Sequence, residues 1–571
     1  MWNDLPSDAS TLMSWTWTNF EPYYQDLLQR PLRAETVNAW LEDWSALDER
    51  LMELRSRLHV ATAVNTADEV ARQRLEAFFD QIFPQAMAAE QKLKQKLLAS
   101  GLEPAGFEIP LRNMRAEVAL FREENLPLLA EEQKLIQEYD RIVGAQTVEW
   151  DGQERTPQQM RTVLQDPDRA RREEAWRRVA QRQLADRAAL NDLWVRLFRL
   201  RRQIAHNAGF ASYRDYRWQQ LLRFDYTPAD CERFREAIAA VVVPQAAARY
   251  ERRRRLMGLT TLRPWDLEAD PLGRPPLRPF RQAGELAERA AHIFAQVDAT
   301  LGRYFETMRR ENLLDLENRK NKAPGGFCTE FAVQRRPFIF MNAVGIHDDV
   351  STLVHEGGHA FHVFETAPIR LVHLLEIPME FAEVASMSME YLTLPYLEAD
   401  HGGFYSTADA NRARVEQMEG ALLFWPFMAV VDGFQHWAYT HPDEAVDPAR
   451  CDAAWGALWE RFMVGVDWSG LDEEMKTGWQ RKLHIYEVPF YYIEYGLAQL
   501  GALQVWRNAQ RDPHEAVTAY RRALALGGSR PLPDLYRTAG ARFSFEAALF
   551  REVTDAMQAA LHTWENDHQG G

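Results

Sequence analysis

The chain has 571 residues, a formal net charge of −16 and a hydrophobic fraction of 46%. This length allows two or more domains and a sizeable core. The acidic balance argues against a nucleic-acid partner, because a phosphate backbone attracts basic surfaces. No uninterrupted apolar segment approaches the roughly 20 residues that cross a bilayer, and no secretory signal is visible at the N-terminus. We therefore expect a cytoplasmic protein that binds neither nucleic acid nor membranes.

Long helical patterns dominate the chain. Apolar residues recur at steps of three and four from Leu190 to Ile204, until Gly209 offers a helix stop. Asp166-Pro167 supplies a helix start upstream. Similar patterns run through 67–100, 283–311 and 538–562, and the polar tail 565–571 is expected to fray. We expect an N-terminal helical lobe over 1–200 and a catalytic region over 201–571.

Charged and thiol clusters give little sign of a further site. Cys231, Cys328 and Cys451 lie far apart in sequence, which fits a reducing compartment and argues against a disulfide framework or a cysteine zinc site. Residues 252–255 are four arginines, which we interpret as a solvated helix face or a turn that joins two lobes rather than a phosphate site.

Strand-like segments are few, and the clearest one is 326–345. Its two apolar runs flank Arg335-Arg336-Pro337, a pattern typical of a short hairpin. A strand beside a metal site can bind a peptide by backbone pairing. We therefore expect substrate contacts at Gly326, Phe327 and Cys328.

A His-Glu-x-x-His motif follows this hairpin. His355 and His359 lie four residues apart, so on a helix both imidazoles face the same way and can bind one ion. Catalytic zinc leaves one position open to water, and Glu356 is placed to act as a base on that water. Gly357 and Gly358 each cost on the order of 1 kcal/mol in a helix relative to Ala. They indicate that another backbone, either a substrate strand or a neighbouring helix, approaches the metal face.

A third ligand has to come from another element. Residues 376–390 supply the carboxylates of Glu376, Glu380, Glu383 and Glu390. The last three share a helical face, so one carboxylate can bind the metal while another orients a ligand imidazole. Spacing alone leaves the choice open. We interpret His362 as an outer-shell or packing residue, because three ligands from one straight helix fit a tetrahedral ion poorly.

Hydrolysis of a peptide also needs donors for the oxyanion that develops on the carbonyl. The stretch 482–496 is rich in neutral donors, which are His484, Tyr491, Tyr492 and Tyr495. Composition by itself favours an aromatic core helix for this stretch.

Two segments, His355-Glu-Gly-Gly-His-Ala-Phe-His362 and Pro378-Met-Glu-Phe-Ala-Glu-Val-Ala-Ser386, resemble the thimet oligopeptidase and oligoendopeptidase F family of metallopeptidases. Residues 325–329 and 262–266 are also similar to oligoendopeptidase F segments, and the similarity is clear from about 262 to 500. The resemblance implies one zinc ion per chain, bound by His355, His359 and Glu383. His362, Ser386 and Glu390 would then surround these ligands.

The same resemblance implies a mostly α-helical, two-lobed ellipsoid with a deep central channel and a small hairpin beside the metal helix. Such a channel admits short unstructured peptides, so the implied activity is that of an oligopeptide endopeptidase. In the family, a His and several Tyr of the C-terminal segment contact substrate and the oxyanion, which implies this role for His484 with Tyr491 or Tyr492. Tyr495 would contact substrate.

The sequence leaves two alternatives to an oligopeptide endopeptidase open. A helical zinc carboxypeptidase or dipeptidyl carboxypeptidase also uses His-Glu-x-x-His with a downstream Glu. A non-catalytic helical peptide-binding protein with a coincidental motif is the alternative of another class. The sequence does not determine the oligomeric state or the preferred residues around the cleaved bond.

Overall fold

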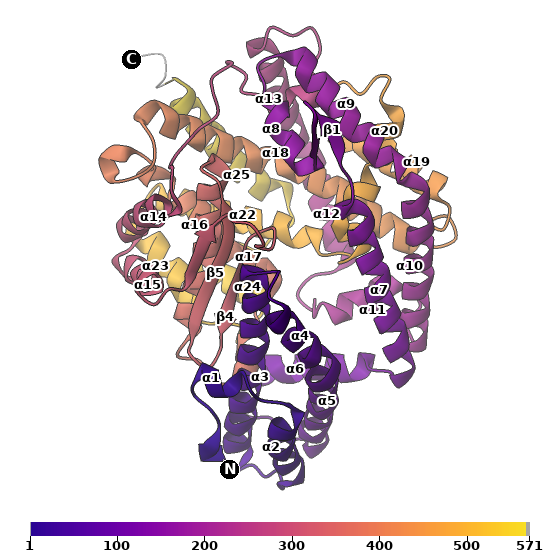
Figure 1. The fold of residues 1–571 in the computed structure, drawn as a ribbon, viewed down its shortest axis with the longest axis vertical. Coiled ribbons are helices and arrows are strands. Elements are labelled where there is room, and N and C mark those ends of the chain that lie inside the picture. The colour runs from indigo at the N-terminus through magenta and orange to yellow at the C-terminus, as the bar shows by residue number, and fades with distance from the viewer. Residues whose placement is uncertain (1, 567–571) are drawn as a thin grey trace.

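The computed structural model describes residues 2–566, so the last five residues of the predicted polar tail lie outside the described part. The chain is mostly helical, as expected, with two small sheets. In Figure 1 the N-terminal helices form one end of the molecule, a sheet with its covering helices lies on one side, and the middle helices lie on the other. No helix in the described chain is long and apolar enough to cross a membrane.

The N-terminal helices have a core of their own. Trp40 and Trp44 are buried side by side in it, with their ring centroids 5.0 Å apart. The helices of this part are α1 (Ala9–Leu12), α2 (Trp17–Gln29), α3 (Val37–Val64), α4 (Glu69–Ala77), α5 (Phe83–Ser100) and α6 (Glu108–Leu120). A short π-helical stretch, η2 (Phe78–Ile82), joins α4 to α5, so the pattern predicted over 67–100 forms two helices in nearly continuous succession.

The middle of the chain forms α7 (Leu126–Gly144), the strands β1 (Val148–Trp150) and β2 (Gln153–Arg155), and the helices α8 (Pro157–Leu164), α9 (Arg169–Ala185), α10 (Arg187–Asn207), α11 (Tyr213–Gln220), α12 (Pro228–Ala237) and α13 (Val243–Leu256). The predicted helix 166–209 is two helices that meet at Asp186. Asp168 caps the first of them, in place of the predicted Asp166.

A three-stranded sheet carries the predicted hairpin. Strands β4 (Phe327–Phe331) and β5 (Arg336–Ala343) pair antiparallel, which confirms the hairpin over 326–345. A further strand, β3 (Leu314–Glu317), pairs parallel to β5 and was not predicted. The strand order is β3-β5-β4, so β4 is an edge strand.

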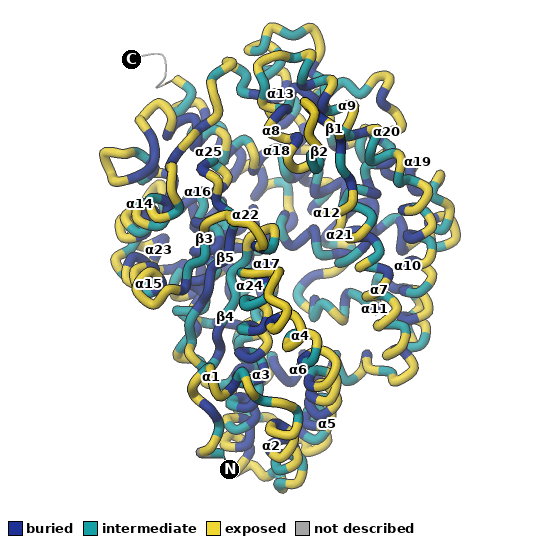
Figure 2. Tube along the Cα trace, viewed as in Figure 1, coloured by how far each residue is buried: buried dark blue, intermediate teal, exposed yellow. Residues whose placement is uncertain are grey.

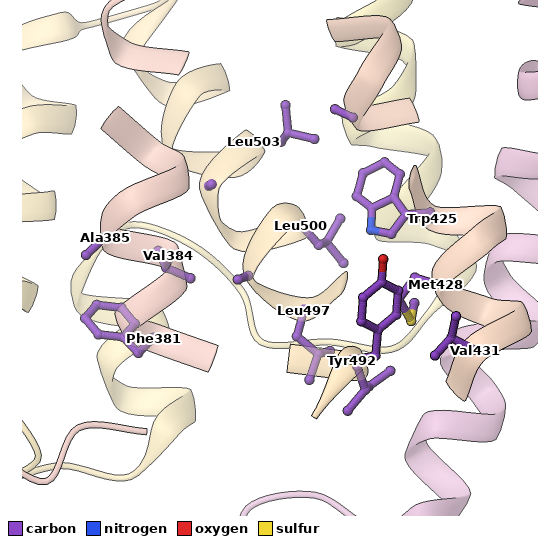
Figure 3. Close-up of a cluster of buried hydrophobic side chains, with 14 of the residues drawn as sticks. Phe381, Val384, Ala385, Trp425, Met428, Val431, Tyr492, Leu497, Leu500 and Leu503 are labelled. Atoms are coloured by element: carbon purple, nitrogen blue, oxygen red, sulfur yellow. The ribbon is translucent and has the colours of Figure 1, made fainter. Parts of the chain in front are cut away.

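The C-terminal part shares the largest hydrophobic core with the middle helices. Its helices are α14 (Ala283–Val297), α15 (Ala299–Arg310), α16 (His347–Thr366), α17 (Met379–Leu392), α18 (Thr407–Thr440), α19 (Pro448–Phe462), α20 (Asp472–Lys476), α21 (Leu483–Tyr486), α22 (Tyr492–Ala509), α23 (Pro513–Leu524), α24 (Leu532–Thr538) and α25 (Ala547–Asn566). Figure 3 shows α22 between α17 and α18, with Val384, Leu500 and Trp425 drawn from these three helices. Figure 2 shows that buried residues follow the inner faces of the helices and the sheet.

Two predicted helical ranges differ in detail. The range 283–311 is broken at Asp298, whose carboxylate caps α15. The range 538–562 contains a non-helical loop, and α25 begins only at Ala547 and continues to Asn566. Glu565 does not fray, because its carboxylate forms ion pairs with Arg249 and Arg252.

Candidate active site

Helix α16 positions the His-Glu-x-x-His motif directly after the hairpin. The helix begins at His347, and Asp349 fixes this start by accepting hydrogen bonds from three backbone N–H groups of the preceding loop. His355 and His359 extend from the same face, with ring centroids 5.0 Å apart. The local helical spacing therefore brings the two imidazoles together, as the sequence predicts.

Helix α17 supplies the carboxylate nearest to both imidazoles. Glu383 Oε2 lies 3.5 Å from Nε2 of His355 and 3.9 Å from Nε2 of His359. The three ligand atoms lie within 4.8 Å of one another. Among the described residues, this is the one group of three or more His, Cys, Asp or Glu side chains whose ligand atoms have the spacing of a metal site. Two imidazoles and one carboxylate match the donor set of catalytic zinc.

The two glycines of the motif meet different neighbours. A Cβ on Gly358 would lie 2.5 Å from the backbone oxygen of Ala385 and 2.6 Å from Cα of Ser386, both on α17. A Cβ on Gly357 would lie 2.7 Å from the ring of Phe294. Of the two approaches that the sequence left open, the neighbouring helix therefore explains Gly358, because only glycine lets α17 come this close to α16.

Glu390 orients the first imidazole. Its Oε1 lies 2.6 Å from Nδ1 of His355, so the Nε2 atom is left to face Glu383. Gln417 of α18 donates a hydrogen bond to the other oxygen of Glu390. Ser386 donates to Oε2 of Glu383 at 3.0 Å. These contacts fix the rotamers of the candidate ligands, as supporting hydrogen bonds do at metal sites.

The electrostatics of the group favour a cation. Burial opposes protonation of His355, but the hydrogen bond and charge of Glu390, with Glu383 and Glu356, raise its pKa to about 9. Burial lowers the pKa of His359 well below its usual value, so this imidazole is neutral and free to act as a ligand. The surplus of carboxylates around two imidazoles fits a bound divalent ion.

Glu356 lies between the candidate metal group and the sheet. It is 8% exposed, and burial raises its pKa to about 7, with the charge of His355 opposing and that of Glu383 adding to the shift. Its carboxyl also interacts with the backbone of Cys328 on β4. Gly326 lies just before this strand, and a Cβ added to it would lie 3.4 Å from Cγ2 of Thr352 on α16. The predicted base and the predicted peptide-binding strand are therefore neighbours.

The other candidates from 362–380 lie outside the ligand group. His362 is buried against Phe381, and its Nε2 forms no hydrogen bond with any described residue. Burial lowers the pKa of His362 to about 4. Glu380 accepts a hydrogen bond from Tyr226, and Glu376 accepts one from Asn113. Their partners leave neither carboxylate directed at the two imidazoles.

A cluster of aromatic donors forms around His484 of α21. Its ring centroid lies 4.9 Å from that of Tyr492, 5.8 Å from that of Tyr495 and 6.1 Å from that of Tyr491. Nδ1 of His484 is buried and forms no hydrogen bond with any described residue. Burial and the ammonium of Lys482 lower the pKa of His484 to about 4, so the imidazole is neutral near neutral pH.

The three tyrosines differ in their surroundings. The charge of Glu383 raises the pKa values of Tyr491 and Tyr495 in addition to burial, which brings Tyr495 to about 12. Tyr492 is 6% exposed and packs against Phe424 and Phe427 of α18. Tyr491 and Tyr495 therefore lie within reach of the charge of Glu383, whereas Tyr492 belongs to the aromatic packing behind His484.

Two buried arginines from the middle of the chain, one in α10 and one in the loop after α11, hold the segment that carries these donors. Arg201 donates to the backbone oxygens of Ile485 and Tyr486. Arg223 donates to the backbone oxygen of Phe490 and to Glu494, each at 2.6 Å.

Sequence reasoning missed Arg201, Arg223 and Gln417. Each lies far along the chain from the residues it contacts, and no local pattern marks any of them.

A predominantly helical fold that brings two imidazoles, a carboxylate ligand and a buried glutamate together defines the class of helical metallohydrolases. The sequence profile of peptidase family M3 matches residues 162–555, and the profile of the M3 N-terminal domain matches residues 11–110. The chain belongs to peptidase family M3.

Known relatives agree with this assignment. Oligopeptidase PepF of Bacillus subtilis is 25% identical over 275 residues, which span 46% of this chain and 40% of that relative. The structure of PZ peptidase A with an inhibitor is 28% identical, covers 99% of each chain and superposes with a TM-score of 0.86. The structure of oligoendopeptidase F from Enterococcus faecium shares the fold, with a TM-score of 0.62 at 15% identity, over 96% of this chain and 97% of that one.

Proposed function

We propose that the protein is a zinc-dependent endopeptidase that hydrolyses internal peptide bonds of short oligopeptides. The observation that carries this proposal is the group of His355, His359 and Glu383, with Glu356 buried beside it. We propose one zinc ion per chain at these three residues. Zinc supplies a Lewis acid that polarises the scissile carbonyl and makes water acidic enough to react near neutral pH.

The residues of the chain supply the remaining chemistry. Glu356 accepts the proton of the attacking water, and its raised pKa suits a group that later returns the proton to the leaving amine. His484 and Tyr491 donate hydrogen bonds to the oxyanion as it forms, and Tyr495 contacts the substrate. All three donors are uncharged at rest, so charge that develops on the carbonyl oxygen is stabilised selectively.

The edge strand β4 provides a place for the peptide. One of its backbone edges has no strand partner in the sheet, and its residue Cys328 interacts with Glu356. A substrate that adds to this edge as an extended strand would lie along the base. This supports Gly326, Phe327 and Cys328 as substrate contacts, and it favours unstructured peptides because a folded protein offers no free strand.

Replacing Glu356 by Gln tests the proposal. We expect hydrolysis of an internally quenched ten-residue peptide to be abolished while one equivalent of zinc remains bound, because the amide keeps the shape but accepts no proton. Zinc content is measured by elemental analysis, and Glu383→Gln is the matched variant that should lose zinc. Retained hydrolysis in Glu356→Gln would exclude Glu356 as the base.

Mass analysis of the cleaved products separates endopeptidase from exopeptidase action. We expect a peptide with an amidated C-terminus to be cut as readily as its free acid. A strict requirement for the free carboxylate would favour a carboxypeptidase or dipeptidyl carboxypeptidase.

The cytoplasmic location and the lobe boundary at residue 200 stay predictions.

A further inference from the structure

A cavity lies in the N-terminal part, outside the candidate active site. Its volume is about 350 Å³, and it lies among α3, η2, α5, α6 and the short turn η6 (Val372–Leu375). Figure 1 shows α3, α5 and α6 together at the N-terminal end of the molecule. Most of the wall is apolar and is formed by Leu51, Met52, Phe78, Phe83, Met87 and Met114.

The cavity also contains a chain of buried polar groups. Nε2 of His373 lies 3.8 Å from Oδ2 of Asp48, and the carboxyl of Asp48 interacts directly with that of Glu90. The indole of Trp44 donates to Oε2 of Glu90 at 2.7 Å. Trp44 and Phe107 pack against the ring of His373 and hold it in place.

One of these polar side chains has no partner. Both ring nitrogens of His373 form no hydrogen bond with any residue that the structure describes, whereas the carboxyl of Glu90 interacts with Asp48, Tyr24 and Trp44. Glu90 is 6% exposed and the side chain of His373 is 9% exposed. Burial lowers the pKa of His373 to about 3, so the ring is neutral and one of its nitrogens is an acceptor. Buried acceptors without donors are costly, which indicates that a donor normally lies among them.

The charges around the cavity favour a cationic donor. Four carboxyl groups line it, against the two cationic side chains of Arg55 and Lys94. Lys94 is already engaged with Glu117, at 2.7 Å. Burial and the charge of Glu90 raise the pKa of Asp48 well above its usual value, although the ammonium of Lys94 opposes this shift.

A metal ion is a poor fit to this group. Among the described residues, the histidine and carboxyl atoms of the cavity do not form a set of three within 4.8 Å of one another. An ammonium group donates hydrogen bonds with nitrogen–acceptor distances of about 2.9 Å, whereas a metal ion lies about 2.1 Å from its ligand atoms. The acceptors around an ammonium group can therefore lie farther apart than the ligands of a metal ion. The apolar wall adds a place for a hydrocarbon body that a metal ion does not have.

We propose that this cavity binds a primary amine with an apolar body. The ammonium group donates hydrogen bonds to Glu90, Asp48 and His373, and the hydrocarbon part packs against Phe78 and Phe83. The N-terminal residue of a peptide, a lysine side chain and a free aralkylamine all share this chemistry.

Calorimetric titration of the full-length protein tests the proposal with three probes of similar size, phenethylamine, 2-phenylethanol and phenylacetate. We expect phenethylamine to bind with one site per chain and at least about tenfold more tightly than the alcohol, a difference of about 1.4 kcal/mol. Phenylacetate should not bind, because its carboxylate would meet acidic groups. Equal affinities for amine and alcohol, or no binding of the amine, would overturn the proposal.

Two variants locate the binding. Glu90→Gln removes the charge while keeping the shape, and it should weaken amine binding at least about tenfold. Met87→Trp obstructs the cavity from an exposed position and leaves both carboxyl groups in place, so it should also abolish binding. Asp43→Asn, on α3 but outside the cavity, is the matched control and should bind like the parent. Amine binding that survives both cavity variants would place the site elsewhere and contradict the proposal.

Two further probes separate the sources of the amine. Phenylalaninamide represents a peptide N-terminus, and Nα-acetyl-lysine methylamide represents a lysine side chain. Preferential binding of one assigns the cavity to that source, and binding of phenethylamine alone assigns it to free amines. All titrations measure binding without turnover, so their outcome is independent of the proposed peptidase activity.

Discussion

At the scale of single residues, the donors around the expected oxyanion position are all neutral. His484 is held neutral by burial and by the ammonium of Lys482, and burial keeps Tyr491 and Tyr495 protonated. A neutral donor stabilises an oxyanion without carrying a charge that would also attract the resting carboxylates. The charge of Glu383 reaches Tyr491 and Tyr495, and this separates them from Tyr492.

Replacing single tyrosines by Phe should therefore have unequal effects. We expect Tyr491→Phe to lower kcat by roughly 10²-fold, the loss typical of one oxyanion donor, with little change in KM. Tyr492→Phe should leave kcat nearly unchanged, because this ring packs against Phe424 and Phe427. Steady-state kinetics on one quenched peptide measures both. A loss of kcat in Tyr492→Phe as large as that in Tyr491→Phe would exchange their roles.

At the scale of elements, the metal group depends on how closely α16 and α17 approach. The two helices meet at Gly358, where any side chain would overlap the backbone of Ala385 and Ser386. Backbone atoms cannot move aside as a flexible side chain can, so a larger residue must separate the helices. Glu383 lies on the helix that would be displaced.

Gly358→Ala should accordingly weaken zinc binding. We expect a loss of at least tenfold in affinity, the range seen when ligand positioning is disturbed, together with a lower melting temperature. Gly420→Ala is the matched control, since Gly420 is also helical but its added Cβ would meet nothing within 4 Å. That variant should be as stable as the parent or more stable by about 1 kcal/mol. Competition with a chelating dye measures the zinc affinity of each variant, and thermal unfolding measures its stability.

The segment between α21 and α22 is a second element whose position matters. Phe490 adopts a positive φ of 66°, a conformation that a non-glycine residue holds only under constraint. Its backbone oxygen accepts from Arg223, and its N–H donates to Gln435. Arg223 also pairs with Glu380 of α17 at 3.6 Å, three residues before Glu383. The same guanidinium thus links this segment to the helix that carries Glu383.

Arg223→Lys tests this link while keeping the charge. We expect kcat to fall by roughly 10²-fold, because small displacements of catalytic groups have effects of this size, whereas zinc content should be unchanged. Arg235→Lys is the control, because Arg235 forms a buried ion pair with Asp432 that does not touch the donor segment. Equal losses in both variants would show that the effect is general destabilisation. Circular dichroism establishes that each variant is folded.

At the scale of the whole molecule, distant parts of the chain converge on the site. Glu53 of α3 accepts hydrogen bonds from the backbone N–H groups of Val333 and Gln334, in the turn between β4 and β5. Arg335 in the same turn pairs with Glu49. The N-terminal helices therefore hold the hairpin of β4 and β5, Arg201 and Arg223 from the middle of the chain hold the segment of His484 and Tyr491, and the C-terminal helices hold the candidate metal group.

The three proposed zinc ligands come from two helices, so they come together only in the folded state. A ligand that binds only the native protein stabilises it by about 2.7 kcal/mol at 100 times its Kd. With the usual entropy of unfolding per residue, we expect a rise in Tm of roughly 2 °C for a chain of this size. Differential scanning fluorimetry of the chelator-treated protein with and without zinc measures it. His359→Ala should show no shift, and a full shift in that variant would place the zinc elsewhere.

The sequence alone determined the features that depend on local geometry. Helical content follows from the spacing of apolar residues, and the hairpin from alternation around a turn. The convergence of His355 and His359 follows from the pitch of one helix. Residues four apart on a helix face the same way whatever surrounds them, so these predictions needed no tertiary contact.

Only the tertiary structure decided which distant groups join them. Spacing placed Glu380, Glu383 and Glu390 on one face, and the family resemblance favoured Glu383. In the structure, Tyr226 and Arg223 engage Glu380, His355 engages Glu390 through Nδ1, and Glu383 is left facing both imidazoles. Periodicity encodes which face of an element is buried but not which element covers it. The positions of Glu383, of Tyr491 and Tyr495, and of the arginines that hold their segment were therefore fixed by packing between segments far apart in the chain.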